Sequence, residues 1–203
     1  MRAKCDIFIR TLCLVFSFAY FTALGARFGD AILAANAVLM NFQNIMAYGL
    51  DGFAHAVEAL GGSAFGAGSR ARFASAVVRT TAWAVGASVL TGLVFYALGE
   101  ELIALFSDLP SVRHDASIYL PWLIASPLLS VLSFQLDGIF IGTGRTAEMR
   151  NAMIASLAGY VLIVQWTAPA LGNHGLWLAL MAFMLLRATT LLAYYPRILR
   201  QLR

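Results

Sequence analysis

Three titratable side chains lie close together in an otherwise apolar stretch of this sequence. Asp51, His55 and Glu58 follow one another at i, i+4 and i+7, and residues with this spacing share one face of an α-helix. Asn44 and Tyr48 extend the same face toward the N-terminal end of the segment. Such a face can take up protons or a cation, because burial and nearby like charges both favour a protonated carboxyl group.

The position of this face within an apolar helix limits where it can point. A charged side chain at the centre of a membrane helix costs about 2.5–3.5 kcal/mol, so we expect the face to contact protein or water rather than lipid. Three interpretations stay open. The face is a buried network that fixes helix packing, a solvated helix end, or a proton- or cation-responsive relay. A solvated end explains Glu58 better than Asp51, which lies deeper in the segment.

A second polar face lies in the segment that carries two prolines. Ser126, Ser130, Ser133 and Asp137 fall on one side of a helix by the same spacing rule. Asp137 is predicted either to meet an arginine or water, or to act as a second cation-sensing carboxylate.

Arg187 is the remaining charge inside an apolar segment. It either extends its aliphatic stem to the membrane interface or pairs with an acid, for which Glu58, Asp137 and Glu148 are candidates. We favour a structural ion pair.

The elements that carry these residues are predicted from composition and length. The chain has 203 residues, of which 61% are hydrophobic and 12% charged, with a mean hydropathy of +0.78. Soluble domains are about half apolar and a quarter charged, and a membrane-spanning helix needs about 20 apolar residues. An all-α membrane protein is therefore expected, with one six-span unit covering residues 1–203. The spans are Asp6–Ala26, Ala31–Leu60, Phe73–Leu98, Ile118–Ile141, Glu148–Ala170 and Gly175–Tyr195.

Turn residues separate the spans at 25–29, 66–68, 142–144 and 172–173. The longest connection, Gly99–Asp115, contains apolar residues at helical spacing, so it forms either a short interfacial helix or the end of the third span. We expect a tail to begin at Pro196, because proline cannot continue the helical hydrogen-bond ladder.

The cationic residues are distributed unevenly between the two sides of this topology. Eleven of the 14 Lys and Arg residues lie on the side of the termini, including Arg10 and Arg203, whereas only Arg27 and Arg113 lie on the other. By the positive-inside rule both termini are cytoplasmic. The net charge of +4 then reflects topology and contact with anionic lipid, because the charges are scattered over short loops, which argues against nucleic-acid binding.

Motifs for catalysis are missing from the sequence. The run GGSAFG around Ser63 lacks the Gly-x-Ser-x-Gly spacing, and neither a His-Glu-x-x-His zinc helix nor a Gly-Lys-Ser/Thr phosphate loop occurs. We therefore expect no enzyme activity, no metal site and no organic cofactor.

Three runs carry a resemblance to a known family: YGLDGFAHAVEALGGSAFGA, FQLDGIFIGTGRTAEMRNAM and LGNHGLWLALMAFMLLRA. Together they resemble the DinF branch of the MATE (multidrug and toxic compound extrusion) transporters, which is named for DNA-damage induction. The resemblance implies the second six-span lobe of a two-lobe bacterial inner-membrane transporter, family spans seven to twelve, with the first lobe absent from this chain. Parallel repeats of this kind place the substrate site between the lobes.

The resemblance also implies a function and residues for it. The family exchanges protons or sodium for organic cations and other toxic compounds, so the expected substrate is small, organic and cationic or amphipathic. Asp137 matches a cation-coupling aspartate of the tenth family span. The first span here has no acid beyond Asp6, and we expect Asp51 or Glu58 to replace the acid of the seventh family span. Protons are favoured over sodium, because Asp, His and Glu on one face titrate without a defined oxygen cage.

Other functions are compatible with the same residues. The chain could be a truncated or split-gene fragment that folds or assembles without transporting, alone, with a missing first lobe or as a pair of copies. A flippase for lipid-linked sugars shares the wider fold, although such proteins usually carry more cationic residues in the central cavity.

Overall fold

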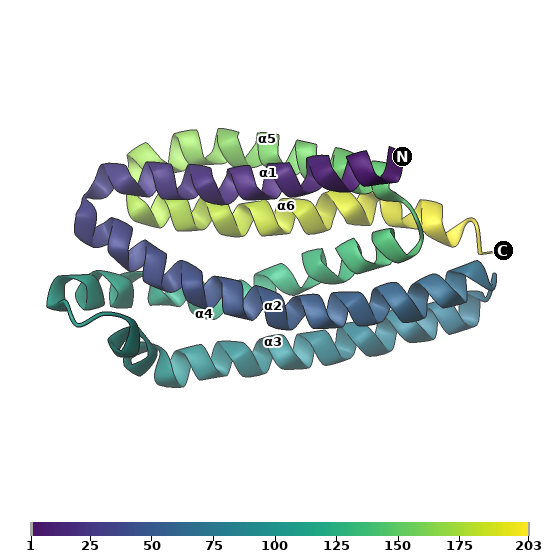
Figure 1. Cartoon of the computed structure of the whole chain (residues 1–203), viewed down its shortest axis with the longest axis horizontal. Coiled ribbons are helices and arrows are strands. Elements are labelled where there is room, and N and C mark those ends of the chain that lie inside the picture. The colour runs from purple at the N-terminus through teal and green to yellow at the C-terminus, as the bar shows by residue number, and fades with distance from the viewer. Residues whose placement is uncertain (1, 203) are drawn as a thin grey trace.

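Six long α-helices and one short 3-10 turn form the computed structural model of this chain, which describes residues 2–202 (Figure 1). The helices are α1 (Arg2–Gly25), α2 (Asp30–Gly66), α3 (Arg70–Phe106), α4 (Pro110–Gly142), α5 (Thr146–Leu171) and α6 (Asn173–Leu199), and η1 (Ala26–Phe28) joins α1 to α2. Within the described range no strand is present, so the predicted all-α class is confirmed. Arg203, which the topology argument included, lies outside the described residues.

The helices run along the long axis of the molecule. Helices α1, α5 and α6 lie together on one side, and α2 and α3 lie side by side on the other, with α4 packed against α2, α3 and α6 (Figure 1). Both termini are at one end, as six antiparallel crossings require. This end also holds the α2–α3 and α4–α5 turns.

Five of these helices are long and apolar enough to cross a membrane, and α2 is not among them. The exception follows from its sequence, because α2 carries amides in its first half, such as Asn36 and Gln43, and the Asp51–Glu58 face in its second. Its length of 37 residues nevertheless takes it along the full bundle beside α3 (Figure 1).

Two of the predicted turns have the same geometry at the same end of the bundle. Gly68 and Gly144 have φ values of 67° and 71°, which side chains other than glycine adopt only with strain. After α2, the Ser69 amide donates to the Ala64 carbonyl at 3.1 Å, and after α4 the Arg145 amide donates to the Phe140 carbonyl at 2.9 Å. These Schellman-type ends satisfy the last carbonyls of both helices.

The structure decides between two interpretations at one helix end and corrects a prediction at another. The segment Gly99–Asp115 is not a short interfacial helix but, as the second interpretation expects, begins with the end of α3, which continues to Phe106 before α4 begins at Pro110. The chain after Pro196 is not a tail, since α6 continues to Leu199. Proline removes one backbone donor, but the buried side chains of Ile198 and Leu202 hold the final turn against the bundle.

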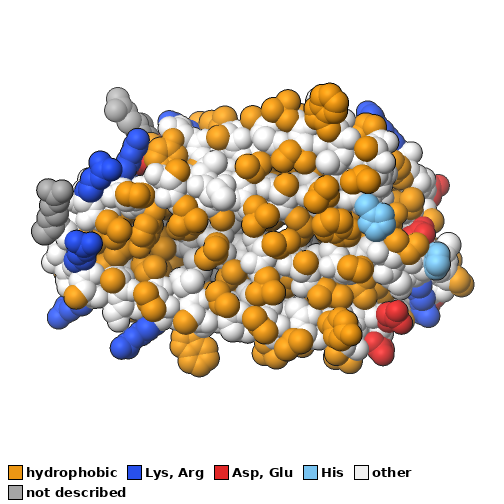
Figure 2. Space-filling model, turned by 180° about the vertical axis from the view of Figure 1, so that it is seen from behind, with side chains coloured by type: hydrophobic (Ala, Val, Ile, Leu, Met, Phe, Trp, Pro, Cys, Tyr) orange, Lys and Arg blue, Asp and Glu red, His pale blue; other side chains and the backbone are white. Residues whose placement is uncertain are grey.

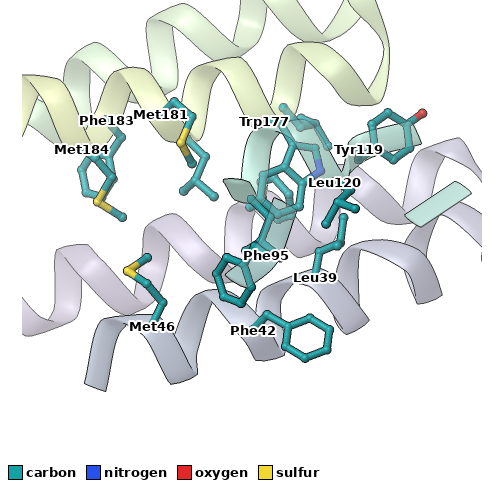
Figure 3. Close-up of a cluster of buried hydrophobic side chains, with 14 of the residues drawn as sticks. Leu39, Phe42, Met46, Phe95, Tyr119, Leu120, Trp177, Met181, Phe183 and Met184 are labelled. Atoms are coloured by element: carbon teal, nitrogen blue, oxygen red, sulfur yellow. The ribbon is translucent and has the colours of Figure 1, made fainter. Parts of the chain in front are cut away.

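Buried aromatic and aliphatic side chains fill the space between the helices (Figure 3). Trp177 and Phe21 meet edge to face with ring centroids 5.2 Å apart. The Trp177 indole also donates to Asn36 Oδ1 at 2.9 Å, and the amides of Asn36 and Asn173 exchange two hydrogen bonds of 2.7 and 2.9 Å. Polar contacts of this kind stabilise membrane helix pairs, because the lipid offers no alternative partners; here they join α2 to α6.

Charged side chains gather at the two ends of the molecule, with an apolar belt between them (Figure 2). Lys and Arg dominate one end, whereas Asp, Glu and His are concentrated at the other. At the end that carries the termini, Asp6 of α1 is almost fully buried and accepts hydrogen bonds from Thr146 at 3.0 Å and Arg150 at 2.5 Å. This contact fastens the start of α1 to the start of α5.

Candidate functional site

The most deeply buried charge cluster in the described chain is centred on Asp137 of α4. Its carboxylate accepts a hydrogen bond from Arg187 of α6 at 2.6 Å and a second one from Arg10 of α1. Side-chain exposure is 6% for Asp137 and 2% for Arg187. One acid therefore bridges two arginines, and three helices converge on it.

Close packing between α2 and α4 fixes the position of this acid. A Cβ atom on Gly138 would collide with the Ala54 carbonyl oxygen, and one on Gly142 would collide with that of Glu58. Gly138 and Gly142 form a Gly-x-x-x-Gly pair, a pattern that lets membrane helices approach to backbone contact. The acid next to Gly138 is thereby held at the α2 interface.

Arg187 is enclosed by aromatic and sulfur-containing neighbours. Its guanidinium lies over the Phe134 and Phe183 rings, 5.6 and 5.8 Å from their centroids, and donates to Met184 Sδ at 3.1 Å. These contacts provide cation–π stabilisation in place of water.

The cluster has unused hydrogen-bonding capacity. Among residues 2–202, Asp137 Oδ1, Arg10 Nε and Arg187 Nε are buried without a hydrogen-bond partner, as is Gln43 Oε1 of α2. Such groups are costly to leave unsatisfied, so these atoms can receive water or a ligand group.

A hollow of about 160 Å³ lies directly beside this cluster. Its polar lining comes from α2 and α6, and Leu14, Phe18 and Phe134 add apolar surface. The polar lining residues are Gln43, Asn44, Tyr48, Asp51 and Arg187.

Asp51 occupies a different environment from Asp137. It is half-buried, forms no ion pair with another residue of the range 2–202 and lies within electrostatic range of Arg10, Arg187 and Asp137. The structure thus places Asp51 and Arg187 on the lining of one hollow, and Arg187 connects that hollow to Asp137.

The remaining residues of the α2 face are exposed or partly exposed. His55 and Glu58 contact each other at 3.2 Å, with side-chain exposures of 77% and 34%, and Tyr48 and Asn44 are also exposed. The opposite side of α2 is buried at Leu50 and Val57. Neither His55 nor Glu58 reaches the Asp137 cluster.

Two of the predicted serines of α4 donate hydrogen bonds to backbone carbonyls of α4 itself. Ser133 Oγ donates to the Ser130 carbonyl at 2.8 Å, and Ser126 Oγ donates to the Leu123 carbonyl at 2.9 Å. Pro127 has no amide hydrogen for the Leu123 carbonyl, so Ser126 replaces that donor. Ser130 Oγ is buried and unpartnered among the described residues, and Ser130 and Ser133 are both absent from the lining of the hollow.

Two residues of the site were missed by the sequence reasoning. Arg10 was assigned to the cytoplasmic side because it lies near the start of the first span, yet its side chain is only 17% exposed and reaches Asp137. Gln43 precedes Asn44 on α2 and lines the same hollow. An arginine and an acid in separate apolar spans were a signal for pairing, whereas nothing in the sequence distinguished Gln43.

A family model and several known proteins match this chain. The MatE family model matches residues 7–167. The Escherichia coli protein "DNA damage-inducible protein F" is 43% identical over 95% of this chain and 42% of its own length. "Protein DETOXIFICATION 43" of Arabidopsis thaliana is 27% identical over 89% of this chain and 34% of its own length.

A solved structure has the same fold. The Vibrio cholerae MATE transporter VcmN, crystallised as a mutant, superposes with a TM-score of 0.86 at 19% identity, over 96% of this chain and 45% of that one. The chain spans less than half the length of each of these three relatives.

Proposed function

The chain belongs to the MatE family of transporters, and from this premise we propose that it forms the C-terminal lobe of a cation-coupled efflux antiporter for small organic compounds. The observation that carries the proposal is the hollow beside Asp137. There, Asp51, a half-buried acid that forms no ion pair within residues 2–202, lies next to a buried Arg–Asp–Arg cluster. The α2 side chains of Asn44, Tyr48 and His55 are exposed within residues 2–202, and the first two also line the hollow.

A second six-helix lobe is the proposed cover for these exposed side chains. In transporters built from parallel repeats the substrate site lies between the repeats, near the middle of the membrane. The exposed side chains of Asn44, Tyr48 and His55 would then line the shared cavity. Its mixed surface, with Phe18 and Phe134 beside amides and an acid, suits an amphipathic or cationic compound.

We assign proton uptake to Asp51 and a fixed structural charge to Asp137. A proton that reaches Asp137 has to displace two guanidinium groups from a buried carboxylate. Asp51 has no such competition. Protonating it removes one negative charge beside Arg10 and Arg187, which lowers the cost of closing the cavity around less water.

Proton uptake and substrate binding are then coupled, because the cavity does not hold a proton on Asp51 and a cationic substrate at the same time. Deprotonated Asp51 attracts a cationic substrate from the cytoplasmic side, and protonation from the outer side releases it. The proton and the substrate each shift the same equilibrium between two arrangements of the lobes. The proposed location is the bacterial inner membrane with both termini in the cytoplasm, in agreement with the gathering of Arg and Lys at the terminal end (Figure 2).

The test uses the two-lobe transporter that contains this chain, reconstituted in vesicles with ethidium as substrate. We expect Asp51→Asn, which fixes this side chain in a neutral form, to abolish efflux driven by a pH gradient and to weaken ethidium binding. Asp108→Asn, which removes an equally negative but fully exposed side chain near the other end, is the matched control and should transport normally.

Efflux by Asp51→Asn that still follows the pH gradient would remove Asp51 from coupling. A sodium gradient applied at constant pH is the second arm of the experiment. If sodium alone drives efflux, the coupling ion is sodium and the proton assignment is wrong.

A further inference from the structure

A second concavity lies far from the Asp137 cluster, between the end of α2 and the start of α3. This α2–α3 groove has a volume of about 560 Å³. Arg72 and Arg79 line it together with Ser63 and Ser75, and no acidic residue is among its lining residues. The groove is therefore a positively charged site with hydroxyl donors beside the charges.

The two arginines are arranged on one face of α3. Arg72, Ser75 and Arg79 follow one another at i, i+3 and i+7, which places them in one row about 10 Å long. Both arginines are exposed, and neither forms an ion pair with a residue of the range 2–202. Their charges are free to meet an anion from outside the bundle.

The groove faces away from the proposed transport cavity. Leu60, on its α2 wall, lies nine residues after Asp51, which is about two and a half helical turns and thus the opposite side of α2. Leu60 is 57% exposed. The groove therefore opens toward the lipid rather than toward a second lobe.

The depth of the groove matches the headgroup region. Helix α3 has 37 residues and is about 55 Å long, which exceeds a hydrocarbon core of about 30 Å. Its first turns therefore reach the polar layer, with Arg72 near the helix start and Arg79 two turns deeper. Ala64, which is buried, and Ala76, which is half-buried, line the groove, and an acyl chain would pack against them.

We propose that the α2–α3 groove binds one anionic phospholipid. Its phosphate lies between Arg72 and Arg79 and accepts hydrogen bonds from them and from Ser75, while one acyl chain lies along Leu60 and Ala64. Basic pockets between membrane helices on the cytoplasmic side have the charge and depth that anionic headgroups need. This site does not depend on the transport function proposed above.

The experiment counts lipids bound to the full-length protein released from nanodiscs of mixed phosphatidylcholine and phosphatidylglycerol, by native mass spectrometry. We expect at least one retained phosphatidylglycerol. Each of Arg72→Gln and Arg79→Gln should weaken its binding about 5-fold. Arg70→Gln and Arg200→Gln remove equally exposed arginines at the same end but outside the groove, and should leave the retained lipid unchanged.

A steric variant tests the groove without changing charge. Ser75→Trp fills it and should expel the lipid, whereas Ala74→Trp adds the same bulk one position away on an exposed face outside the lining and should not. Equal losses in groove and control variants would overturn the proposal in favour of diffuse attraction. Inorganic phosphate that binds as well as the lipid would overturn it in favour of a soluble anion site.

Discussion

Replacing Asp137 by leucine tests the charge cluster most directly. The wild-type cluster contains two positive charges and one negative charge, with Asp137 accepting from both Arg10 and Arg187. Asp137→Leu leaves two adjacent guanidinium groups without an acid between them. Arg187→Met instead leaves a one-to-one pair of Arg10 and Asp137, so it should be the milder change although Arg187 is the more buried residue.

The expected losses in the free energy of unfolding follow from how deeply Asp137, Arg187 and Arg10 are buried. Removing one partner of a buried ion pair costs about 3–5 kcal/mol, and we expect this loss for Asp137→Leu. Arg187→Met should cost about 1.5–3 kcal/mol, the value of a hydrogen bond to a charged group. In the double variant Arg10 is the only remaining charge, and it is 17% exposed, so its stem can extend toward water. The double variant should therefore be more stable than the sum of the single losses predicts, by about 1–3 kcal/mol.

Unfolding by sodium dodecyl sulfate in mixed micelles gives these free energies for purified protein. Asp108→Leu and Arg113→Met form a control pair, because Asp108 is fully exposed and Arg113 is 41% exposed; it should show no measurable coupling. Additive losses at Asp137 and Arg187 would refute the reasoning, and so would an Arg187→Met loss larger than that of Asp137→Leu.

Two further outcomes follow from the helix contacts and use the same unfolding assay. Gly138→Ala should destabilise the protein by about 1–3 kcal/mol, because the added Cβ collides with the Ala54 carbonyl. In the control variant Gly49→Ala the added Cβ meets no atom within 4 Å, so its stability should not change. Equal stability of the two variants would mean that α2 and α4 are not in backbone contact. Asn36→Leu removes the oxygen that accepts from the buried donors of Asn173 and Trp177, and it should lower the free energy of unfolding by about 2–4 kcal/mol. Asn41→Leu, at an exposed position, is the control. A loss no larger than that of the control would show that water replaces the Asn36 amide.

The sequence was sufficient to predict the fold, because the membrane places one strict requirement on the backbone. Backbone groups in lipid must be satisfied within helices, so apolar length and glycine turns such as Gly144 located the elements. Helix ends were less predictable. The sequence left two interpretations open for Gly99–Asp115, whereas the proline rule at Pro196 gave way to tertiary packing, because Ile198 and Leu202 are buried.

The site was only partly predictable, because pairing depends on which helices are neighbours. Spacing on one helix placed Asp51, His55 and Glu58 on a common face, but it could not show that only Asp51 approaches the Asp137 cluster. For Arg187 three acids were candidates, and the structure pairs it with Asp137. Arg10 was misassigned because its depth in the first span was judged from its distance to the terminus alone.

The backbone contact between α2 and α4 also has a mechanical consequence. The glycines at positions 62, 138 and 142 place the two helices at carbonyl distance over two turns, so neither can slide or rotate past the other without a collision. Helices α2 and α4 must therefore move as one unit, which keeps Asp51 and Asp137 at a constant separation. Helix α1 packs mainly against α5, so Arg10 is held on a different pair of helices from the two acids.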